Sequence, residues 1–242
     1  MSNNTEETIN PKFKALDEIK KGCMIIGGED EDVKMCEIQQ EFRNGIESIA
    51  KYDSSVTFYG SALIKEDHPS FEKARHLAYR ISKELDYVIF SGGGGGIMEA
   101  ANRGAYEAGG ESVGLTIRLP HEQKTNKYVK DEIPFNFFFS RQTTMSYSTE
   151  VCIFCPGGYG TFSELFEILT LQQTNKIERF PVILFGVDFW GPIKQTIREV
   201  LLEKYKTIEA EDLDLYIITD DEDEILKIIK NSKIRDGEDV LN

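Results

Sequence analysis

Two glycine-rich loops, each placed where an apolar strand gives way to a helix, constrain this chain more than any other feature. The first loop spans Ser91–Gly96 and follows the apolar run Tyr87–Phe90. The second spans Pro156–Gly160 and follows Val151–Phe154. Backbone without side chains lets several N–H groups converge on one anion, and the partial positive charge of a helix N-terminus adds to the attraction. Two such loops in one chain predict a phosphate-bearing ligand that is held from both sides.

Beyond residue 55, short apolar runs typical of strands alternate with segments whose apolar residues recur at helical spacing. The predicted strands are 56–59, 87–90, 112–117, 151–154, 181–185 and 215–219, with an aromatic edge segment at 135–139. The predicted helices are 70–85, 97–108, 141–149, 161–174, 192–204 and 222–230. This alternation is typical of parallel sheets. The sequence therefore predicts an α/β fold, a Rossmann-like open parallel sheet with helices on both faces.

The chain divides into three parts by composition. Residues 1–50 form an expected N-terminal extension, residues 51–231 the α/β domain, and residues 232–242 a polar tail. Within the extension, Ile38, Phe42, Ile46 and Ile49 recur at spacings of four, four and three. This period predicts a helix at about 36–50 that packs onto the main domain.

Charge excludes two classes of partner. The chain has 242 residues and a formal net charge of −14, and an acidic surface repels nucleic acid and anionic membranes. A membrane-spanning helix needs about 18 consecutive apolar residues, and no apolar run in the sequence is close to that length. The N-terminus lacks the apolar segment of a signal peptide. We therefore expect a cytoplasmic protein with neither nucleic acid nor a membrane as its partner.

The sequence shows no metal site. The three histidines are dispersed, and Cys152 and Cys155 lie three residues apart on a predicted strand, where their side chains point to opposite faces. Two such cysteines cannot share a metal ion or form a disulfide with each other. We expect both to be buried thiols.

A dinucleotide cofactor site is one interpretation of the first loop. The Rossmann fingerprint G-x-G-x-x-G needs a third glycine and an acidic residue about 20 positions further on. Gly92 and Gly94 supply the first two glycines, but Ile97 stands at the third position, and the strand 112–117 runs into Arg118. These departures disfavour NAD or FAD. Glycines that serve only tight turns remain the simpler alternative for either loop taken alone.

Glu164 has two interpretations. It lies three residues after Thr161, the spacing of a capping box, in which each residue bonds the backbone N–H of the other. It also lies beside the second loop, where a carboxylate can accept hydrogen bonds from ribose, stabilise a cationic sugar or activate a water. Spacing alone leaves both open.

Arg141 and Glu122 are likewise ambiguous. Arg141 follows an aromatic segment and is either a surface residue whose stem covers apolar groups or a planar fork for a phosphate or a purine edge. Glu122 lies in a polar loop and is either a solvated charge or a ligand contact.

These motifs together resemble the Lonely Guy family, which has long been labelled "possible lysine decarboxylase". The most specific match is P-G-G-x-G-T-x-x-E at Pro156–Glu164, and others are Ile97–Ala105, the Arg141 region, Leu119–Gln123 and Glu178–Val182. The resemblance covers roughly residues 50–230 and implies a Rossmann-like domain, usually dimeric, with its active site near the subunit interface.

The resemblance also implies an activity. Lonely Guy proteins cleave the N-glycosidic bond of a purine nucleoside 5′-monophosphate, AMP or a cytokinin ribotide, to the free base and ribose 5-phosphate, without a metal or an organic cofactor. The family pattern makes Arg141 and Glu164 catalytic. Glu122 and Thr170 match positions that contact ligand. Phosphate contacts would fall on Gly93, Gly94, Gly95, Gly96, Gly157, Gly158, Gly160 and Thr161.

Two departures from the family pattern bear on function. Gln142 stands where relatives usually have lysine, so one cationic substrate contact is missing, and Gly95 stands where many have proline. The first departure keeps open a non-catalytic, nucleotide-sensing protein. Nucleotide-sugar or molybdopterin chemistry on a similar fold is a second alternative. A decarboxylase would need a lysine Schiff base to pyridoxal phosphate, and neither loop nor the segment around Arg141 contains a lysine.

Overall fold

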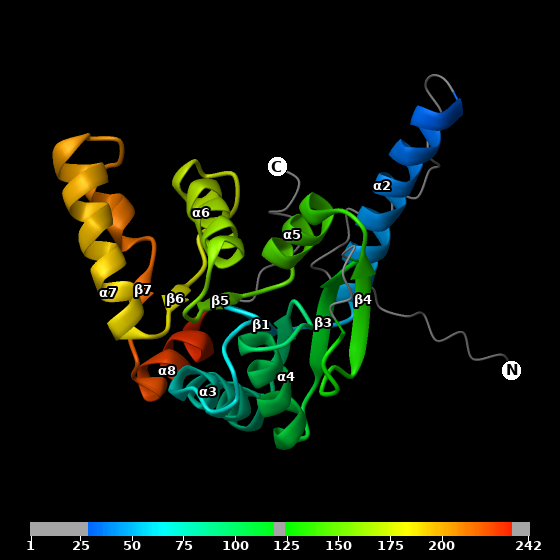
Figure 1. The fold of residues 1–242 in the computed structure, drawn as a ribbon, viewed down its shortest axis with the longest axis horizontal. Helices are drawn as coiled ribbons and strands as arrows, with labels where there is room; N and C mark the ends of the chain where they lie inside the picture. Colours follow the sequence, from blue (N-terminus) through cyan, green and yellow to red (C-terminus); the bar gives the residue numbers. More distant parts are fainter. Residues whose placement is uncertain (1–28, 119–123, 234–242) are drawn as a thin grey trace, which may run out of the picture.

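The computed structural model describes residues 29–118 and 124–233, and their strands form one seven-stranded parallel sheet (Figure 1). The strand order is β4-β3-β2-β1-β5-β6-β7, and every neighbouring pair is parallel. The strands are β1 (Ser55–Tyr59), β2 (Val88–Ser91), β3 (Ser112–Ile117), β4 (Asp131–Phe135), β5 (Val151–Phe154), β6 (Val182–Leu184) and β7 (Ile217–Ile218). The predicted fold class is therefore confirmed.

Helices cover both faces of this sheet, with α3, α4 and α8 on one side and α5, α6 and α7 on the other (Figure 1). The helices are α2 (Glu29–Ile49), α3 (Pro69–Leu85), α4 (Ile97–Ala108), α5 (Phe138–Tyr147), α6 (Tyr159–Gln173), α7 (Val187–Thr196) and α8 (Glu222–Asn231). A π-helix (Ile197–Lys204) continues α7, and a short 3₁₀ helix spans Ala210–Asp214. No helix of the described residues is long and apolar enough to cross a bilayer.

Alternate residues of the central strands enter opposite hydrophobic cores. On β5, Val151 and Ile153 join the core under α3, whereas Cys152 and Phe154 join the core on the side of α6. Period-two alternation with both faces buried is what a covered parallel strand requires. Cys155 enters the core opposite to that of Cys152, and both are buried thiols, as predicted.

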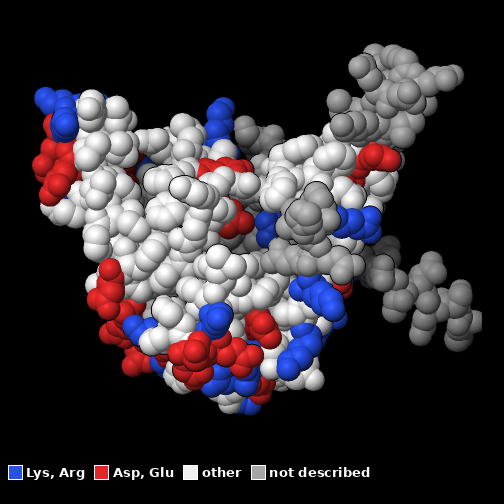
Figure 2. Space-filling view, in the orientation of Figure 1, with Lys and Arg blue, Asp and Glu red and all other residues white. Residues whose placement is uncertain are grey.

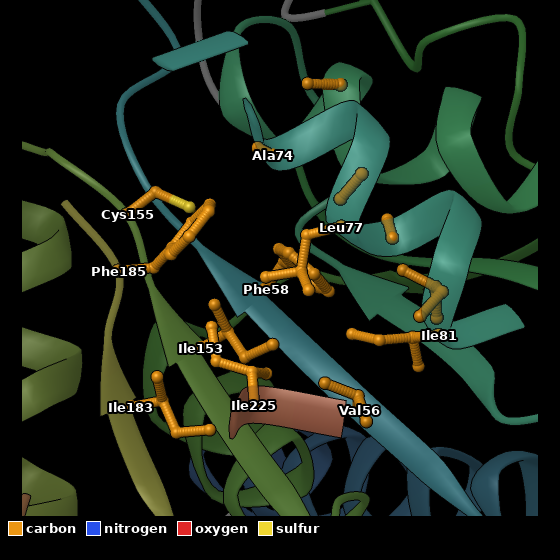
Figure 3. Packing of buried hydrophobic residues seen from close by; sticks show 14 of the residues in the cluster. Val56, Phe58, Ala74, Leu77, Ile81, Ile153, Cys155, Ile183, Phe185 and Ile225 are labelled. Carbon is orange, nitrogen blue, oxygen red and sulfur yellow. The ribbon is translucent and has the colours of Figure 1, made fainter. Parts of the chain in front are cut away.

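Figure 3 shows the core under α3 from close by. Leu77 and Ile81 of α3 face Phe58 of β1, and all three side chains are fully buried. The outer surface of this layer is charged: in Figure 2, acidic and basic side chains gather over α3, α4 and α8, whereas the face over α5 and α6 is mostly uncharged. Surface ion pairs such as Arg80–Asp223 link α3 to α8.

Helix α2 begins at Glu29, earlier than the predicted 36, and lies beside β4 and α5 at one edge of the sheet (Figure 1). Ile49 is buried in the main core, and Ile46 packs against it. The approach is close at Gly45, where an added Cβ would come within 2.9 Å of the Phe135 ring and of Thr144 Oγ1. Residues 1–28 and the tail beyond 233 lie outside the described residues, so the three-part division stays a prediction.

Three predicted elements are displaced along the chain. The edge segment 135–139 is wrong, because the edge strand β4 ends at Phe135 and the next aromatic residues begin α5. On β4 only Ile133 and Phe135 are buried, the pattern of a half-covered edge. Helix α5 begins at Phe138, before the predicted 141, just after an N-cap residue whose N–H donates to Glu41 of α2, and α7 begins five residues before Pro192.

Candidate active site

A cavity of about 280 Å³ opens at the carboxyl ends of β1, β2 and β5. Strand order reverses direction between β1 and β5, and open α/β sheets bind ligands at such a switch point. Both glycine loops reach this cavity, Gly92 from the first and Gly158 from the second. The other lining residues are Phe58, Tyr59, Gly60, Ser61, Ala62, Met98, Ile117, Phe138, Arg141, Met145, Gly160, Thr161 and Glu164.

Ser61 ties the two glycine loops together through its backbone. Its N–H donates to the carbonyl oxygen of Pro156 at 3.1 Å, and its own carbonyl accepts from Ile97 N–H at 3.0 Å. Pro156 opens the second loop, and Ile97 begins the helix that follows the first. The β1 end therefore fixes the separation of the two loops across the cavity.

Arg141 and Glu164 form an ion pair in this cavity. Arg141 Nη1 lies 3.4 Å from Glu164 Oε1, and the two side chains expose only 10% and 17% of their surface. Glu164 comes from the second turn of α6 and Arg141 from the first turn of α5. Helices on the same side of the sheet thus place the two predicted catalytic side chains together, although 23 residues separate them in sequence.

Two further contacts hold the Arg141 guanidinium. Its Nε donates a 2.7 Å hydrogen bond to the carbonyl oxygen of Leu115 on β3. Gly92 leaves the space that the guanidinium occupies, since a Cβ at that position would lie 2.3 Å from Arg141 Nη2. The arginine is therefore 8% exposed and fixed, not a mobile surface residue.

The Glu164 carboxyl has a raised pKa. Burial is the main cause, and the negative charge of Glu167 one turn along α6 adds to it, whereas the Arg141 guanidinium opposes the shift. The fully buried Tyr59, which lines the same cavity, has a pKa raised well above its usual value by burial, by Cys152 and by Glu164. A desolvated carboxylate beside a fixed cation is typical of groups that bind or transfer protons in enzymes.

The capping box, one of the two interpretations of Glu164, is absent. Helix α6 begins at Tyr159 with Gly158 as its N-cap, and no side chain caps it. Thr161 therefore lies inside the first turn, buried and facing the cavity, and the Glu164 carboxylate contacts Arg141 instead of the Thr161 backbone. The first-turn N–H groups of α6 lack intrahelical partners, as at every helix N-terminus. The spacing T-x-x-E was thus misleading, because α6 begins two residues before Thr161.

The first loop is shaped by two residues that only glycine suits. Gly93 and Gly96 have φ of 72° and 66°, a region that other L-residues rarely adopt. The Asn126 amide donates to the carbonyl oxygens of Gly93 and Gly94 at 3.1 and 2.9 Å and so holds the loop from outside. Within the part of the chain that the structure describes, no acceptor contacts the N–H of Gly94, Gly95 or Gly96.

The second loop has glycines that neither conformation nor internal packing explains. A Cβ on Gly158 or Gly160 would meet nothing within 4 Å, and neither residue has a positive φ. At Gly157, by contrast, a Cβ would clash with the Thr161 side chain at 2.2 Å. Open space at two glycines that line the cavity is compatible with a ligand approaching the backbone closely.

Two predicted ligand contacts, Thr170 and Glu122, are not among the described residues that line the cavity. Thr170 is exposed on α6, where its hydroxyl donates to the carbonyl oxygen of Phe166 at 2.7 Å, and it is not part of the cavity lining. Glu122 lies outside the described residues. Sequence reasoning gave no site role to Gly92, Tyr59 or Met98. Gly92 could have been recognised, since it is the first residue after a parallel strand that ends at a ligand site.

A comparison with known families fits this geometry. A sequence profile described as "Possible lysine decarboxylase" matches residues 98–229, more than half of the chain. The chain belongs to the Lonely Guy family. This Lonely Guy match includes Arg141 and Glu164 and begins just after the first glycine loop.

Curated relatives of the Lonely Guy family match part of the chain. Cytokinin riboside 5′-monophosphate phosphoribohydrolase LOG2 of Arabidopsis thaliana is 28% identical over 48% of this chain and 55% of its own length. LOG5 of the same plant is 29% identical over 57% and 60%. The chain thus spans a little more than half the length of these plant relatives. An uncharacterized protein of Archaeoglobus fulgidus is 30% identical over 56% of this chain and 90% of its own length.

Solved structures share the fold. The molybdenum cofactor carrier protein of Chlamydomonas reinhardtii superposes with a TM-score of 0.54 and 20% identity, over 74% of this chain and 98% of that protein. The molybdenum cofactor binding protein of Rippkaea orientalis gives 0.52 and 19%, over 73% and 93%. At these identities the likeness concerns the Rossmann-like architecture alone.

Proposed function

We propose that this protein hydrolyses the N-glycosidic bond of purine nucleoside 5′-monophosphates, with AMP or a cytokinin ribotide as substrate. One water adds to C1′ of the ribose, the bond from C1′ to the base nitrogen breaks, and the products are the free base and ribose 5-phosphate. Membership of the Lonely Guy family and the names of the plant relatives support this reaction class.

The observation that carries the proposal is the Arg141–Glu164 pair in a cavity that both glycine loops reach. The loops supply backbone N–H groups for a 5′-phosphate, from Gly94, Gly95 and Gly96 on one side and from Gly157, Gly158, Gly160 and Thr161 on the other, whereas the Gly93 N–H donates to the Ser91 hydroxyl. A phosphate bound there would leave its ribose facing the carboxylate, which lies one and a half turns further along α6.

In the proposed reaction, Glu164 orients the ribose and stabilises the oxocarbenium-like transition state, or it activates the attacking water. Arg141 assists departure of the base or balances the phosphate charge, and its fixed guanidinium needs no reorganisation to do so. Because the dielectric of a buried site is low, the charge of Glu164 acts more strongly on a developing cation there than it would in water. Neither role requires a metal ion or an organic cofactor.

A product assay tests the proposal. Purified protein is incubated with AMP, GMP, IMP and isopentenyladenine ribotide, and release of the free base is followed by chromatography. We expect base release from one or more purine monophosphates, and Glu164→Gln should lower the rate by ~10²–10⁴-fold, the usual contribution of a positioned acid or base. The preferred base emerges from the ratio of kcat/KM values.

Glu203→Gln provides the matched control, because Glu203 is exposed on the π-helix and is not part of the cavity lining. This variant removes the same charge and should keep full turnover. Binding of AMP without any base release by the wild type would refute the hydrolase and leave a nucleotide-binding protein. Equal rates for Glu164→Gln and the wild type would refute the role of the carboxylate.

We further propose a homodimer as the working assembly. Four aromatic side chains near the cavity are more than two-fifths exposed, namely Phe138, Phe139, Tyr159 and Phe166. Exposed apolar groups beside a cavity are typical of an interaction surface. Light scattering on the purified protein should give twice the chain mass of 27.5 kDa, and Phe166→Glu should shift the species towards the monomer.

A further inference from the structure

Glu41 of α2 makes a set of contacts that the proposed reaction does not use. Its side chain is 8% exposed. Oε2 accepts hydrogen bonds from the backbone N–H and the side-chain amide of Asn136, at 2.7 and 2.9 Å. Oε1 accepts from the Phe137 N–H at 3.0 Å and from the Ser140 hydroxyl. Four donors therefore converge on one carboxylate, which is as many as its oxygens hold comfortably.

All four donors belong to the start of α5. Phe137 is the N-cap of this helix, and its side chain cannot accept a hydrogen bond, so α5 has no cap of its own. The carboxylate of Glu41 accepts a hydrogen bond from the N–H of this N-cap residue, the bond that an N3 side chain makes in a capping box, from 95 or more residues away in sequence. A negative charge at a helix N-terminus also interacts favourably with the helix dipole.

Electrostatics agree with a permanently ionised cap. Burial by itself raises the pKa of the Glu41 carboxyl, but the hydrogen bonds from Ser140, Asn136 and Phe137 together hold it below its usual value. Such a carboxylate is charged at neutral pH and keeps its donors fixed.

Arg141 follows Ser140 directly and lies in the first turn of the capped helix. The Arg141 guanidinium makes two contacts at the same time, from Nε to the Leu115 carbonyl oxygen and from Nη1 to the Glu164 carboxylate. Both contacts form only if the first turn of α5 keeps its present position and rotation. Helix α2 also touches the same turn through rings, since the centroids of Phe42 and Phe139 lie 5.9 Å apart.

We propose that Glu41 is a positioning residue for Arg141: the N-terminal helix supplies the cap that sets the first turn of α5 and thereby the guanidinium in the cavity. This inference rests on the proposed function and extends it to a segment that precedes the family match at 98–229. The N-terminal helix then contributes to the site of this protein, and is more than a covering of the sheet edge.

Kinetics of Glu41→Gln test the proposal against a matched control. Glutamine has one acceptor oxygen where glutamate has two, so the backbone N–H of either Asn136 or Phe137 loses its acceptor. Glu47→Gln removes the same charge from an exposed position on the same helix. We expect Glu41→Gln to lower kcat for base release by at least ~10-fold, since misplacement of a reacting group by about 1 Å costs ~10²-fold. Glu47→Gln should match the wild type.

A double-mutant cycle separates positioning from a general loss of stability. If Glu41 acts through Arg141, Glu41→Gln should change kcat by less than about twofold in an Arg141→Ala background, because coupled residues are not additive. The proposal would be overturned if the fold-reductions in kcat caused by Glu41→Gln and Arg141→Ala multiplied in the double variant while the melting temperatures stayed equal.

A second readout works even if the wild type releases no base, which would refute the hydrolase alone. The Arg141 Nε–H, assigned in ¹H–¹⁵N spectra by its loss in Arg141→Lys, should exchange slowly with solvent in the wild type and in Glu47→Gln. It should exchange quickly in Glu41→Gln. Unchanged protection would overturn the proposal. Should Glu41→Gln fail to fold, Glu41→Asp keeps the charge, and the same loss of protection is expected because its shorter side chain withdraws the carboxylate from α5.

Discussion

Replacing Gly92 by alanine should damage the proposed chemistry while leaving the fold intact. The structure gives Gly92 one evident purpose, which is to leave room for the guanidinium of Arg141. A Cβ there would lie 2.3 Å from Arg141 Nη2 and 2.6 Å from the Met98 sulfur. Gly92 has no positive φ, so alanine adds no backbone strain, and the atoms it meets are the far ends of two flexible side chains.

The displacement sets the size of the effect. An ordinary contact of a Cβ atom begins at about 3.4 Å, so the guanidinium must retreat by about 1 Å. A shift of that size in a positioned group costs ~10²-fold in rate, or about 2.7 kcal/mol of transition-state stabilisation. The contact with Glu164, already 3.4 Å long, would lengthen or break. Since Arg141 opposes the raised pKa of Glu164, that pKa should rise further.

Steady-state base release from AMP measures this prediction, beside thermal unfolding of both proteins. We expect kcat to fall by ~10²-fold and the melting temperature to change little. Gly191→Ala is the matched control, because a Cβ at Gly191 of α7 meets nothing within 4 Å and alanine is the better helix former. Wild-type kcat in Gly92→Ala, with a crystal structure showing Arg141 unmoved, would refute the reasoning.

Four further predictions concern stability and the pH dependence of the rate. Gly96→Ala should lower the free energy of unfolding in urea by at least ~1–3 kcal/mol, because its φ is 66° and a Cβ would lie 2.2 Å from the carbonyl oxygen of Ser61. Trp190→Phe should cost about 1–3 kcal/mol in the same assay, since the buried indole donates to the Phe154 carbonyl at 2.8 Å. In a pH–rate profile, kcat/KM should fall as pH drops through the raised pKa of Glu164, above the usual 4.5. The same shift means that ionising Glu164 costs folding stability as pH rises, so Glu164→Gln should gain stability relative to the wild type towards neutral pH.

Local patterns in the sequence were sufficient for six of the seven strands and for most of the helices, but not for the edge strand β4. The strands at 112–117 and 151–154 and the helix at 97–108 agree with the structure residue for residue, because glycine or proline bounds most of these apolar runs and their period is clear. The same local logic failed at α5. The N-cap residue of α5 donates its N–H to a carboxylate of α2 that lies almost a hundred residues away, and no local pattern contains that contact.

The candidate site shows the same division. The glycine loops and the pair Arg141 and Glu164 could be named from motifs, and a shared cavity follows once parallel strands end at one edge. Local spacing could not decide between a capping box and a free carboxylate at Glu164. The answer depends on where α6 begins, and because the helix starts at Tyr159, Thr161 lies inside its first turn and is not its N-cap. The contribution of Leu115, which is a backbone carbonyl, leaves no trace in sequence at all.

Helix α6 carries both an open N-terminal turn and the carboxylate of Glu164, with no break between them. Six residues separate Gly158 from Glu164, which at 1.5 Å per residue is about 9 Å along a rigid rod. Under the proposed function, α6 sets the distance between the bound 5′-phosphate and the ribose carbon C1′ at which the bond breaks. A nucleoside without its 5′-phosphate would lose the contact with the N-terminus of α6. A diphosphate bound by its terminal phosphate would hold the ribose too far from Glu164. The length of the phosphate chain would therefore be selected by this one helix.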